Sequence, residues 1–296
     1  MNSANEVVQN QLRDHLLRIE EALSGDVILF CGPIAFGVDE IIRDAVERLV
    51  EGSSAGRRDK IGFLLETTGG YIEVAQRIAD TLRKHYDIVE FIVPNYAYSA
   101  GTVLVMSGDA IHMDYFSVLG PIDPQLPRRD GSMVPALGYL KQYERLIEKS
   151  QAGKLSTAEM AFLLQKFDPG ELYAYEQARD LSISLLKEWL VKYKFKNWVK
   201  TETRKKKVTP HMRVARAEQI AKQLNEIHRW NSHGRGISME TLRRDLNLVI
   251  EDFGTNAALN SGIRTYYKLL KSFMETVQQR HVVHTKFQYI PLGGAA

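Results

Sequence analysis

Two short turns constrain the fold of this chain more than any other feature: Thr67-Thr68-Gly69-Gly70 and Tyr98-Ser99-Ala100-Gly101-Thr102. Each turn follows an apolar run, 61–65 or 89–93, and precedes apolar residues at helical spacing. This order predicts the strand-to-helix turns of one βαβαβ unit. The first amides of a helix have no partner within the helix, so they can hold an anion. The two turns therefore suit an oxyanion and a nucleophile.

The rest of the chain extends this α/β pattern in its first half and becomes mostly helical after residue 150. Apolar residues among charges predict an amphipathic helix at 5–23, and Ser156 with Glu159 forms a capping-box pattern. Residues 292–296 resemble a frayed tail. The expected helices cover 5–23, 38–50, 72–82, 100–107, 135–151, 156–167, 171–196, 213–230, 238–246 and 260–279, and the expected strands cover 26–31, 61–65, 89–93, 110–113 and 117–119.

Composition places the chain among ordinary globular proteins. It has 296 residues, of which 44% are hydrophobic and 25% charged, enough for one large core or two modest domains. No run reaches the length of a membrane span, and the N-terminus does not have the pattern of a signal peptide, so we expect a cytoplasmic protein. The single cysteine, Cys31, excludes an intramolecular disulfide and a cysteine metal cluster; we expect a small buried thiol.

The net charge of +3 hides a basic stretch at 187–216, which holds eleven Lys or Arg and two Glu, a balance of +9. Such a block can bind nucleic acid or acidic lipid, but it is more typical of a solvated helix face or an inter-subunit contact. The helices at 213–230 and 238–246 flank a loop around His233 and invite comparison with a DNA-binding helix-turn-helix. That loop is too long, and the second helix offers few base-reading side chains, so we expect no nucleic-acid partner.

Residues 64–125 resemble the core of the Clp-fold serine proteases, the ClpP/crotonase-like group. The motifs ETTGG, YSAGT and GPIDPQ are weak singly, but their order and spacing are specific. Within the group, the chain is most similar to the serine dehydrogenase proteinases (SDH family), which are related to the signal peptide peptidase SppA. The resemblance covers residues 25–150 well and 150–280 loosely. It implies a ClpP/crotonase-like stacked ββα-type core with a largely helical C-terminal extension.

The resemblance also implies the roles of the turn residues. Ser99 matches the nucleophile of the family, and the alternative is that it only caps the following helix. The amides of Gly70 and Ala100 match the oxyanion hole, which holds the negative charge of the attacked carbonyl. Gly69 and Thr68 would contact the substrate. The alternative for the two glycines is a plain tight turn.

The general base is where the sequence departs from ClpP. The loop 120–125, where ClpP-type enzymes carry a histidine, contains none, and His112 lies in an expected strand. SppA-like enzymes use a lysine from a later helix, and a lysine can act as a base when burial keeps it neutral. Lys141 is the first candidate and Lys149 the second, while a purely structural role for both stays open. Asp123 could orient a polar partner.

These observations predict an N-terminal amphipathic helix at 1–24, a Clp-fold catalytic core at 25–155 and a helical extension or oligomerisation region at 156–290. The expected function is hydrolysis of polypeptides by a cytoplasmic serine peptidase with a Ser-Lys dyad, without a cofactor or metal. The resemblance implies a homo-oligomer. The chain has no P-loop, so any ATP-driven unfolding would come from a partner ATPase. The alternatives are a catalytically silent scaffold that binds an acidic partner, and a crotonase-type acyl-CoA enzyme.

Overall fold

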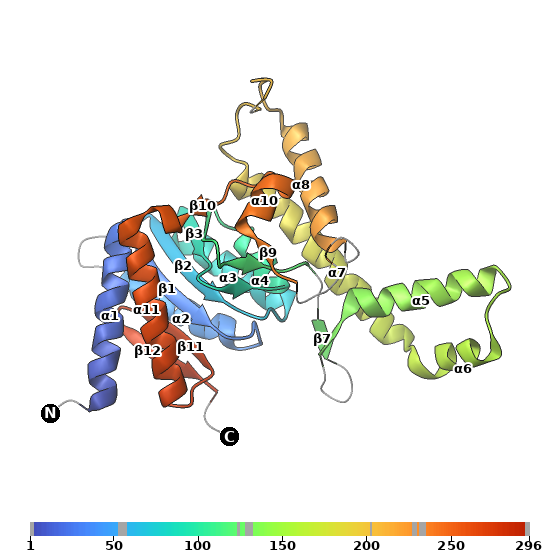
Figure 1. Cartoon of the computed structure of the whole chain (residues 1–296), viewed down its shortest axis with the longest axis horizontal. Helices are drawn as coiled ribbons and strands as arrows, with labels where there is room; N and C mark the ends of the chain where they lie inside the picture. The colour runs from blue at the N-terminus through green and yellow to red at the C-terminus, as the bar shows by residue number, and fades with distance from the viewer. Residues whose placement is uncertain are drawn as a thin grey trace.

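The computed structural model of the chain describes residues 3–52, 58–122, 125–127, 133–201, 203–226, 230 and 235–293. Its centre is a seven-stranded sheet in the order β10-β5-β3-β2-β1-β11-β12 (Figure 1). The strands from β10 to β1 pair in parallel, and β11 and β12 close the other edge in antiparallel pairing. Two small sheets, β4-β6-β9 and β7-β8, accompany it. This confirms the α/β class with a ClpP-like core and a helical C-terminal part.

The bounds of the elements are as follows. The strands are β1 (Asp26–Cys31), β2 (Lys60–Glu66), β3 (Ile88–Ile92), β4 (Tyr96–Ala97), β5 (Ala110–Met113), β6 (Val118–Leu119), β7 (Gln125–Pro127), β8 (Met133–Pro135), β9 (Ile237–Ser238), β10 (Glu251–Asp252), β11 (His281–Thr285) and β12 (Gln288–Leu292). The helices are α1 (Ala4–Leu23), α2 (Val38–Glu51), α3 (Ile72–His85), α4 (Ala100–Val105), α5 (Ala136–Gln151), α6 (Thr157–Lys166), α7 (Pro169–Trp189), α8 (Pro210–Asn225), α10 (Met239–Leu246) and α11 (Ala257–Thr276), with a π-helical turn η1 (Leu190–Lys194) and a 3-10 turn η2 (Phe253–Thr255).

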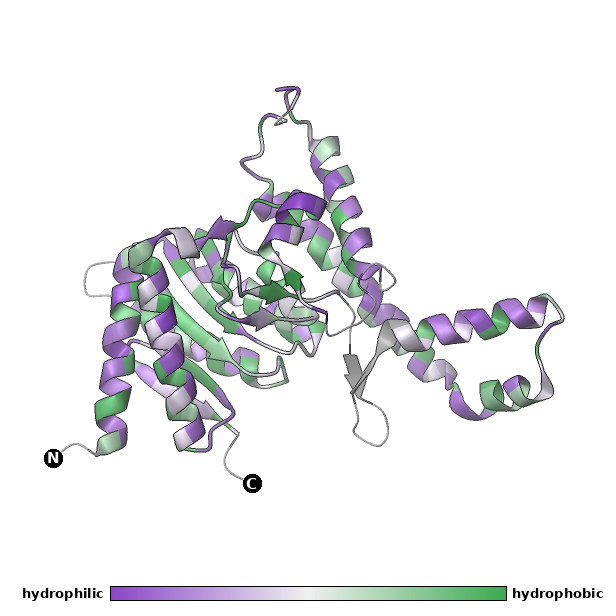
Figure 2. Ribbon diagram, viewed as in Figure 1, coloured by the Kyte–Doolittle hydropathy of each residue, from purple (hydrophilic) through white to green (hydrophobic). Residues whose placement is uncertain are grey.

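The sheet is covered on both faces, as continuous apolar strands require. All six residues of β1 are buried, and they alternate between two cores. Ile28 and Phe30 belong to the core shared with α2 and α3, whereas Val27 and Leu29 belong to the core shared with α1 and α11. Figure 2 shows hydrophobic strands between helices that carry both hydrophobic and hydrophilic residues. None of the helices in the described ranges is long and apolar enough to cross a bilayer.

Helices α5 and α6, with the first turns of α7, form an arm that projects from this body (Figure 1). The arm has its own small core, in which Leu140, Leu172 and Tyr175 are buried together. The predicted capping box at its second helix is confirmed, because Ser156 and Glu159 exchange hydrogen bonds between side chain and backbone. The arm therefore has a hydrophobic cluster separate from those of the central sheet, and α7 connects it to the main core.

Most expected elements are confirmed, with shifts of a few residues at their ends. The helix expected at 171–196 begins at Pro169 and continues after Trp189 as a π-helical turn that ends at Lys194. The helix expected at 213–230 begins at Pro210 and ends at Asn225. The frayed tail is wrong for Leu292, which ends β12. Strands β11 and β12 were not predicted, and they return the C-terminal part of the chain to the core sheet beside β1. The loop residues Asp123 and His233 lie outside the described residues.

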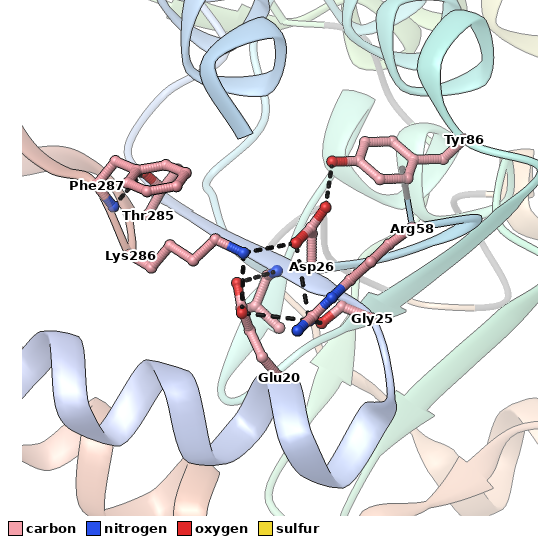
Figure 3. Close-up of polar contacts among 9 residues, drawn as sticks. Glu20, Gly25, Asp26, Arg58, Tyr86, Thr285, Lys286 and Phe287 are labelled. Atoms are coloured by element: carbon pink, nitrogen blue, oxygen red, sulfur yellow. Dashed lines mark hydrogen bonds and ion pairs between the residues drawn. The ribbon is translucent and has the colours of Figure 1, made fainter. Parts of the chain in front are cut away.

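A buried ion cluster fixes the amino ends of the strands (Figure 3). Asp26, at the start of β1, is 1% exposed and accepts hydrogen bonds from Tyr86 (2.9 Å) and Lys286 (2.8 Å). Glu20 of α1 accepts from the same lysine (3.2 Å) and from Arg58 (3.3 Å). Two carboxylates and two cations thus balance in charge, as buried ions must. The cluster ties α1 and the β11–β12 turn to the amino edge of the sheet.

We predict that His284 makes the stability of the fold depend on pH. His284 lies in β11 and its Nδ1 is 2.7 Å from the Tyr266 hydroxyl. Burial lowers its pKa from 6.5 to about 4, so the unfolded chain takes up the proton first and stability falls as the pH drops from 6.5 towards 4. At about 1.4 kcal/mol per pH unit, this amounts to about 3 kcal/mol.

Urea unfolding between pH 7 and pH 4 measures this effect in the wild type and in His284→Phe. The substitution also removes the bond to Tyr266, which shifts stability equally at every pH. The wild type should lose more stability on acidification than the variant. Identical pH slopes for the two proteins would contradict the assignment.

Candidate active site

The two predicted turns lie against each other at the carboxyl edge of the sheet. The Thr67 amide donates to the Tyr96 carbonyl (3.1 Å), and the Tyr98 amide donates to the Thr67 carbonyl (3.0 Å). A Cβ built on Gly69 would lie 2.8 Å from the Cβ of Ser99, so only a residue without a side chain fits there. The structure therefore brings the glycine turn and the serine turn into direct contact.

Ser99 occupies a backbone conformation that residues other than glycine rarely adopt. Its φ is 53° and its ψ is −120°, and it is 1% exposed at the start of α4. Residues kept in such conformations are over-determined by their surroundings and cluster at functional sites. A similarly sharp strand-to-helix turn presents the serine in the nucleophile elbow of α/β-hydrolases. The side chain does not cap α4, so the reading of Ser99 as a mere helix cap is not supported.

The glycine turn is shaped by its contact with Ile34. The Ile34 amide donates to the Gly69 carbonyl, and the Tyr71 amide donates to the Ile34 carbonyl, both at 2.8 Å. Gly70 lies between these bonds with a φ of 145°, and a Cβ there would meet the Ile34 oxygen at 2.1 Å. The Gly69 carbonyl and the Gly70 amide belong to one trans peptide group and point in opposite directions, so the Gly70 amide points away from Ile34.

The amides proposed for the oxyanion hole have no acceptor in the described part of the chain. The Gly69 amide, in contrast, is occupied by the Thr67 hydroxyl at 3.0 Å. The amides of Gly70 and Ala100 bond to no carbonyl or side chain among the described residues. Amides left unpaired beside a nucleophile can stabilise the negative charge of a tetrahedral intermediate. Thr68, the other predicted substrate contact, is exposed next to them.

Two threonines that the sequence analysis did not single out hold this arrangement. The Cγ2 of Thr67 fills the space beside Gly101, where a Cβ would come within 2.3 Å. The buried Thr102 hydroxyl donates to the Ala97 carbonyl (2.8 Å) and accepts from the Gly120 amide (3.0 Å). These bonds fix the start of α4 against its neighbours. The sequence offered one sign of this role for Thr102, which is a polar residue in the otherwise apolar helix α4.

The candidate lysines lie on the arm rather than in the body. Lys141 is exposed on α5, and no hydrogen bond or ion pair joins it to Ser99. Lys149 lies further along α5 and bonds to Glu159 at 2.5 Å. The hydrogen bond from Lys149 lowers the pKa of Glu159 to about 2. Of the two, Lys141 is the one without a carboxylate partner among the described residues.

Two other groups that could act as a base are committed elsewhere. His112 is in β5, as expected, and its Nε2 lies 3.0 Å from Glu90. Burial lowers the pKa of Lys194 to about 8, but its Nζ lies 3.5 Å from the Asp109 carbonyl, just before β5 begins. Since β5 is parallel to β3, Asp109 belongs to the amino edge of the sheet, whereas Ser99 follows the carboxyl edge. Lys194 therefore does not serve this site.

Some cations of the basic stretch 187–216 form ion pairs within the folded chain. Lys187 pairs with Glu218 at 2.8 Å, and Lys196 pairs with Asp109. Five of the other cations gather on a hairpin closed by the bridge between Lys200 and Lys207. This basic hairpin exposes Lys200, Arg204, Lys205, Lys206 and Lys207.

The described residues contain no group of three or more His, Cys, Asp or Glu side chains arranged to hold a metal ion. The sheet order and the contact between the two turns are what the resemblance to the Clp-fold group leads one to expect. Comparison with known proteins agrees: residues 33–211 match the family described as ClpP-like SDH-type serine proteinases. This match covers more than half of the chain, which therefore belongs to that family.

Two similar proteins come from Methanocaldococcus jannaschii, and both are described as uncharacterized. MJ0137 is 37% identical over 100 residues, which is 33% of this chain and 33% of that protein. MJ1495 is 35% identical over 89 residues, 30% of this chain and 29% of that protein. The chain thus matches about a third of the length of each relative.

We predict that Gly69→Ala destabilises the protein through contact with Ser99. Gly37→Ala is the matched control, since Gly37 has a similar φ (91° against 98°) but a Cβ there meets nothing within 4 Å. The backbone conformation alone should cost each variant about 1–2 kcal/mol of unfolding free energy. Gly69→Ala should cost about 1–3 kcal/mol more, because the new methyl overpacks the turn.

Urea denaturation of both variants and the wild type gives these free energies. Equal losses in the two variants would show that the two turns are not packed against each other.

Proposed function

We propose that the chain is a serine peptidase in which Ser99 attacks the scissile carbonyl of a polypeptide. The observation that carries this proposal is the strained backbone of Ser99 in contact with Gly69. The Ser99 oxygen would bond to the carbonyl carbon, and the amides of Gly70 and Ala100 would hold the oxyanion. Collapse of this intermediate would release the amine with a proton and leave an acyl-enzyme, which water would hydrolyse to free Ser99.

The base in this proposal is Lys141, with Lys149 as second candidate. A base must accept the Ser99 proton and deliver it to the leaving amine. Lys149 would first have to give up its bond to Glu159, which favours Lys141. Because burial favours neutral lysine, we propose that α5 becomes covered when the substrate binds or the protein assembles.

We propose that the assembly is a homo-oligomer that uses the arm. None of the residues of α6 is buried, and the arm exposes large apolar side chains to solvent. These are Met160, Phe162, Leu164 and Tyr173, with exposed fractions of 42%, 50%, 76% and 62%. Exposed apolar groups on a projecting element are typical of a contact surface. We propose residues 25–155 as the catalytic core and residues 156–290 as the oligomerisation region. Within the second region, helix α11 packs on the core sheet and strand β11 pairs with β1, so its contacts between subunits would come from the arm.

Other features support the setting of the proposed enzyme. Cys31 is a buried free thiol, as expected, which suits a cytoplasmic location.

A crotonase-type reaction would need carboxylates to serve as acid and base at the glycine turn. The nearest one in sequence, Glu66, is 3% exposed and bonds to Lys271 at 2.8 Å. We therefore favour the serine peptidase over the acyl-CoA enzyme.

One observation favours a second function, a scaffold for an acidic partner. The basic hairpin carries five cations that have no carboxylate partner among the described residues. Such a cluster attracts anions in a salt-dependent way. This function would persist in Ser99→Ala, which separates it from catalysis.

We predict that Ser99→Ala lowers the hydrolysis rate of unfolded fluorescent casein by at least about 1,000-fold, because the acyl-enzyme cannot form. Lys141→Ala should lower kcat by about 100-fold or more, the usual contribution of a general base. Lys141→Arg should be as inactive, because arginine keeps its proton. Lys154→Ala is the matched control, an exposed lysine between α5 and α6.

Wild-type activity that survives in Ser99→Ala would refute the proposal. Loss in Ser99→Ala alone would move the role of base away from Lys141. Hydrolysis that is absent from the wild type as well would favour the scaffold.

A further inference from the structure

A buried carboxylate at the carboxyl edge of the sheet joins four parts of the chain. Glu66, the last residue of β2, is 3% exposed. It accepts hydrogen bonds from Lys271 (2.8 Å), from Tyr267 and from Asn95 (3.3 Å), and the Cys31 thiol approaches it at 3.6 Å. A buried carboxylate is tolerated only with such partners. The group therefore acts as a junction between β1, β2, the segment before β4, and α11.

Helix α11 contributes a polar stripe to this junction. Arg264, Tyr267 and Lys271 are spaced by three and four residues, so they share one face of the helix. Arg264 donates to the Pro94 carbonyl at 2.6 Å and pairs with Asp114, which follows β5. We call these three side chains the α11 clamp. It bonds to the ends of β2 and β5 and to the chain after β3.

The junction is linked to the glycine turn through β1. Cys31 ends β1 opposite Glu66 in the parallel pair. Three residues further, Ile34 makes the two 2.8 Å hydrogen bonds that orient Gly70. A shift of β1 relative to β2 would therefore change the direction of the Gly70 amide.

A second link leads to the nucleophile. Asn95 donates to Glu66 and also to the Tyr267 hydroxyl (3.1 Å). The next residue, Tyr96, accepts the Thr67 amide, and Thr67 in turn directly follows Glu66. Ser99 is three residues beyond Tyr96, on the same short segment. Glu66 thus directly precedes the glycine turn in sequence, and its hydrogen bond with Asn95 connects it to the segment that carries Ser99.

We propose that the α11 clamp positions the oxyanion amide of Gly70 and the Ser99 hydroxyl through Glu66, a role that rests on the proposed peptidase function. Glu66 and Tyr267 are positioning residues. The helix that carries the clamp, α11, lies outside residues 33–211, which match the family. Residues of the C-terminal part would thus set the geometry of a site built by the N-terminal part.

Lys271 acts in this arrangement as a counter-ion. Burial alone would lower its pKa, but the hydrogen bond and the charge of Glu66 leave the pKa above its ordinary value. A lysine held in its charged form cannot take the Ser99 proton. It neutralises Glu66 instead, and its side chain is 42% exposed.

The test compares Tyr267→Phe with Tyr86→Phe. Both substitutions remove a tyrosine hydroxyl that donates to a buried carboxylate, Glu66 or Asp26. Asp26 belongs to the ion cluster at the amino edge (Figure 3), so Tyr86→Phe controls for loss of stability alone. Glu66→Gln is a second variant, which keeps the shape of the side chain and removes its charge.

The activity readout is the split between kcat and KM for casein. Tyr267→Phe and Glu66→Gln should lower kcat by about 10-fold or more, with KM within about twofold, because misplacement of the reacting groups by about 1 Å can cost about 100-fold. Tyr86→Phe should leave kcat within about twofold. Unchanged kcat in Tyr267→Phe and Glu66→Gln would overturn the clamp, as would an equal fall in Tyr86→Phe.

The second readout, hydrogen exchange, does not depend on activity. The hydrogen-bonded amides of residues 67, 69, 71, 98 and 101 should exchange about 10-fold faster in Tyr267→Phe than in the wild type, and not in Tyr86→Phe. The reason is that loss of the Tyr267 hydrogen bond makes local opening of the two turns easier. If the wild type does not hydrolyse casein, the proposed function fails, and exchange alone decides on the clamp. Unchanged exchange at both turns in Tyr267→Phe would overturn the clamp whether or not the protein is a peptidase.

Discussion

The two hydrogen bonds of Thr67 with the Tyr96–Tyr98 segment are the interaction on which the rest of the site depends. They hold the end of β2 beside the chain that leaves β3, so that Gly69 and Ser99 touch. Parallel pairing makes this possible, because the carboxyl ends of neighbouring parallel strands meet at one edge. Gly69 has no side chain, and the positive φ of Ser99 is maintained by packing around it. A small displacement of either strand would separate the two turns.

The remainder of the molecule fixes the two edges of the sheet in different ways. The amino edge is fixed by balanced ions around Asp26, which tie α1 and the β11–β12 turn to the start of β1. The carboxyl edge is fixed by α11, whose polar stripe bonds to Glu66 and to the chain after β3 and β5. The arm stands outside this frame and carries the candidate lysines. We therefore infer that the positions of the proposed nucleophile and oxyanion amides are fixed within one chain, whereas the proposed base depends on what covers the arm.

Local signals explain why so much of the site was predictable from the sequence. Gly69, Gly70 and Ser99 lie within motifs a few residues long, and a strand followed by a helix fixes where such a turn points. The bonds of Glu66 could not be predicted in this way, because Lys271 lies 205 residues away. Strands β11 and β12 were missed because β11 has only two consecutive apolar residues, Val282 and Val283, and β12 contains a proline. The burial of Lys194 likewise depends on tertiary contacts that no local pattern reveals.

The most direct test of the account is to treat the native protein with a fluorophosphonate and to locate the adduct by mass spectrometry. Such a probe reacts with a serine that is activated as a nucleophile beside an oxyanion hole. We predict one adduct per chain, on Ser99, and none on the urea-unfolded chain. Absence of an adduct on the native protein, or an adduct on another residue, would contradict it.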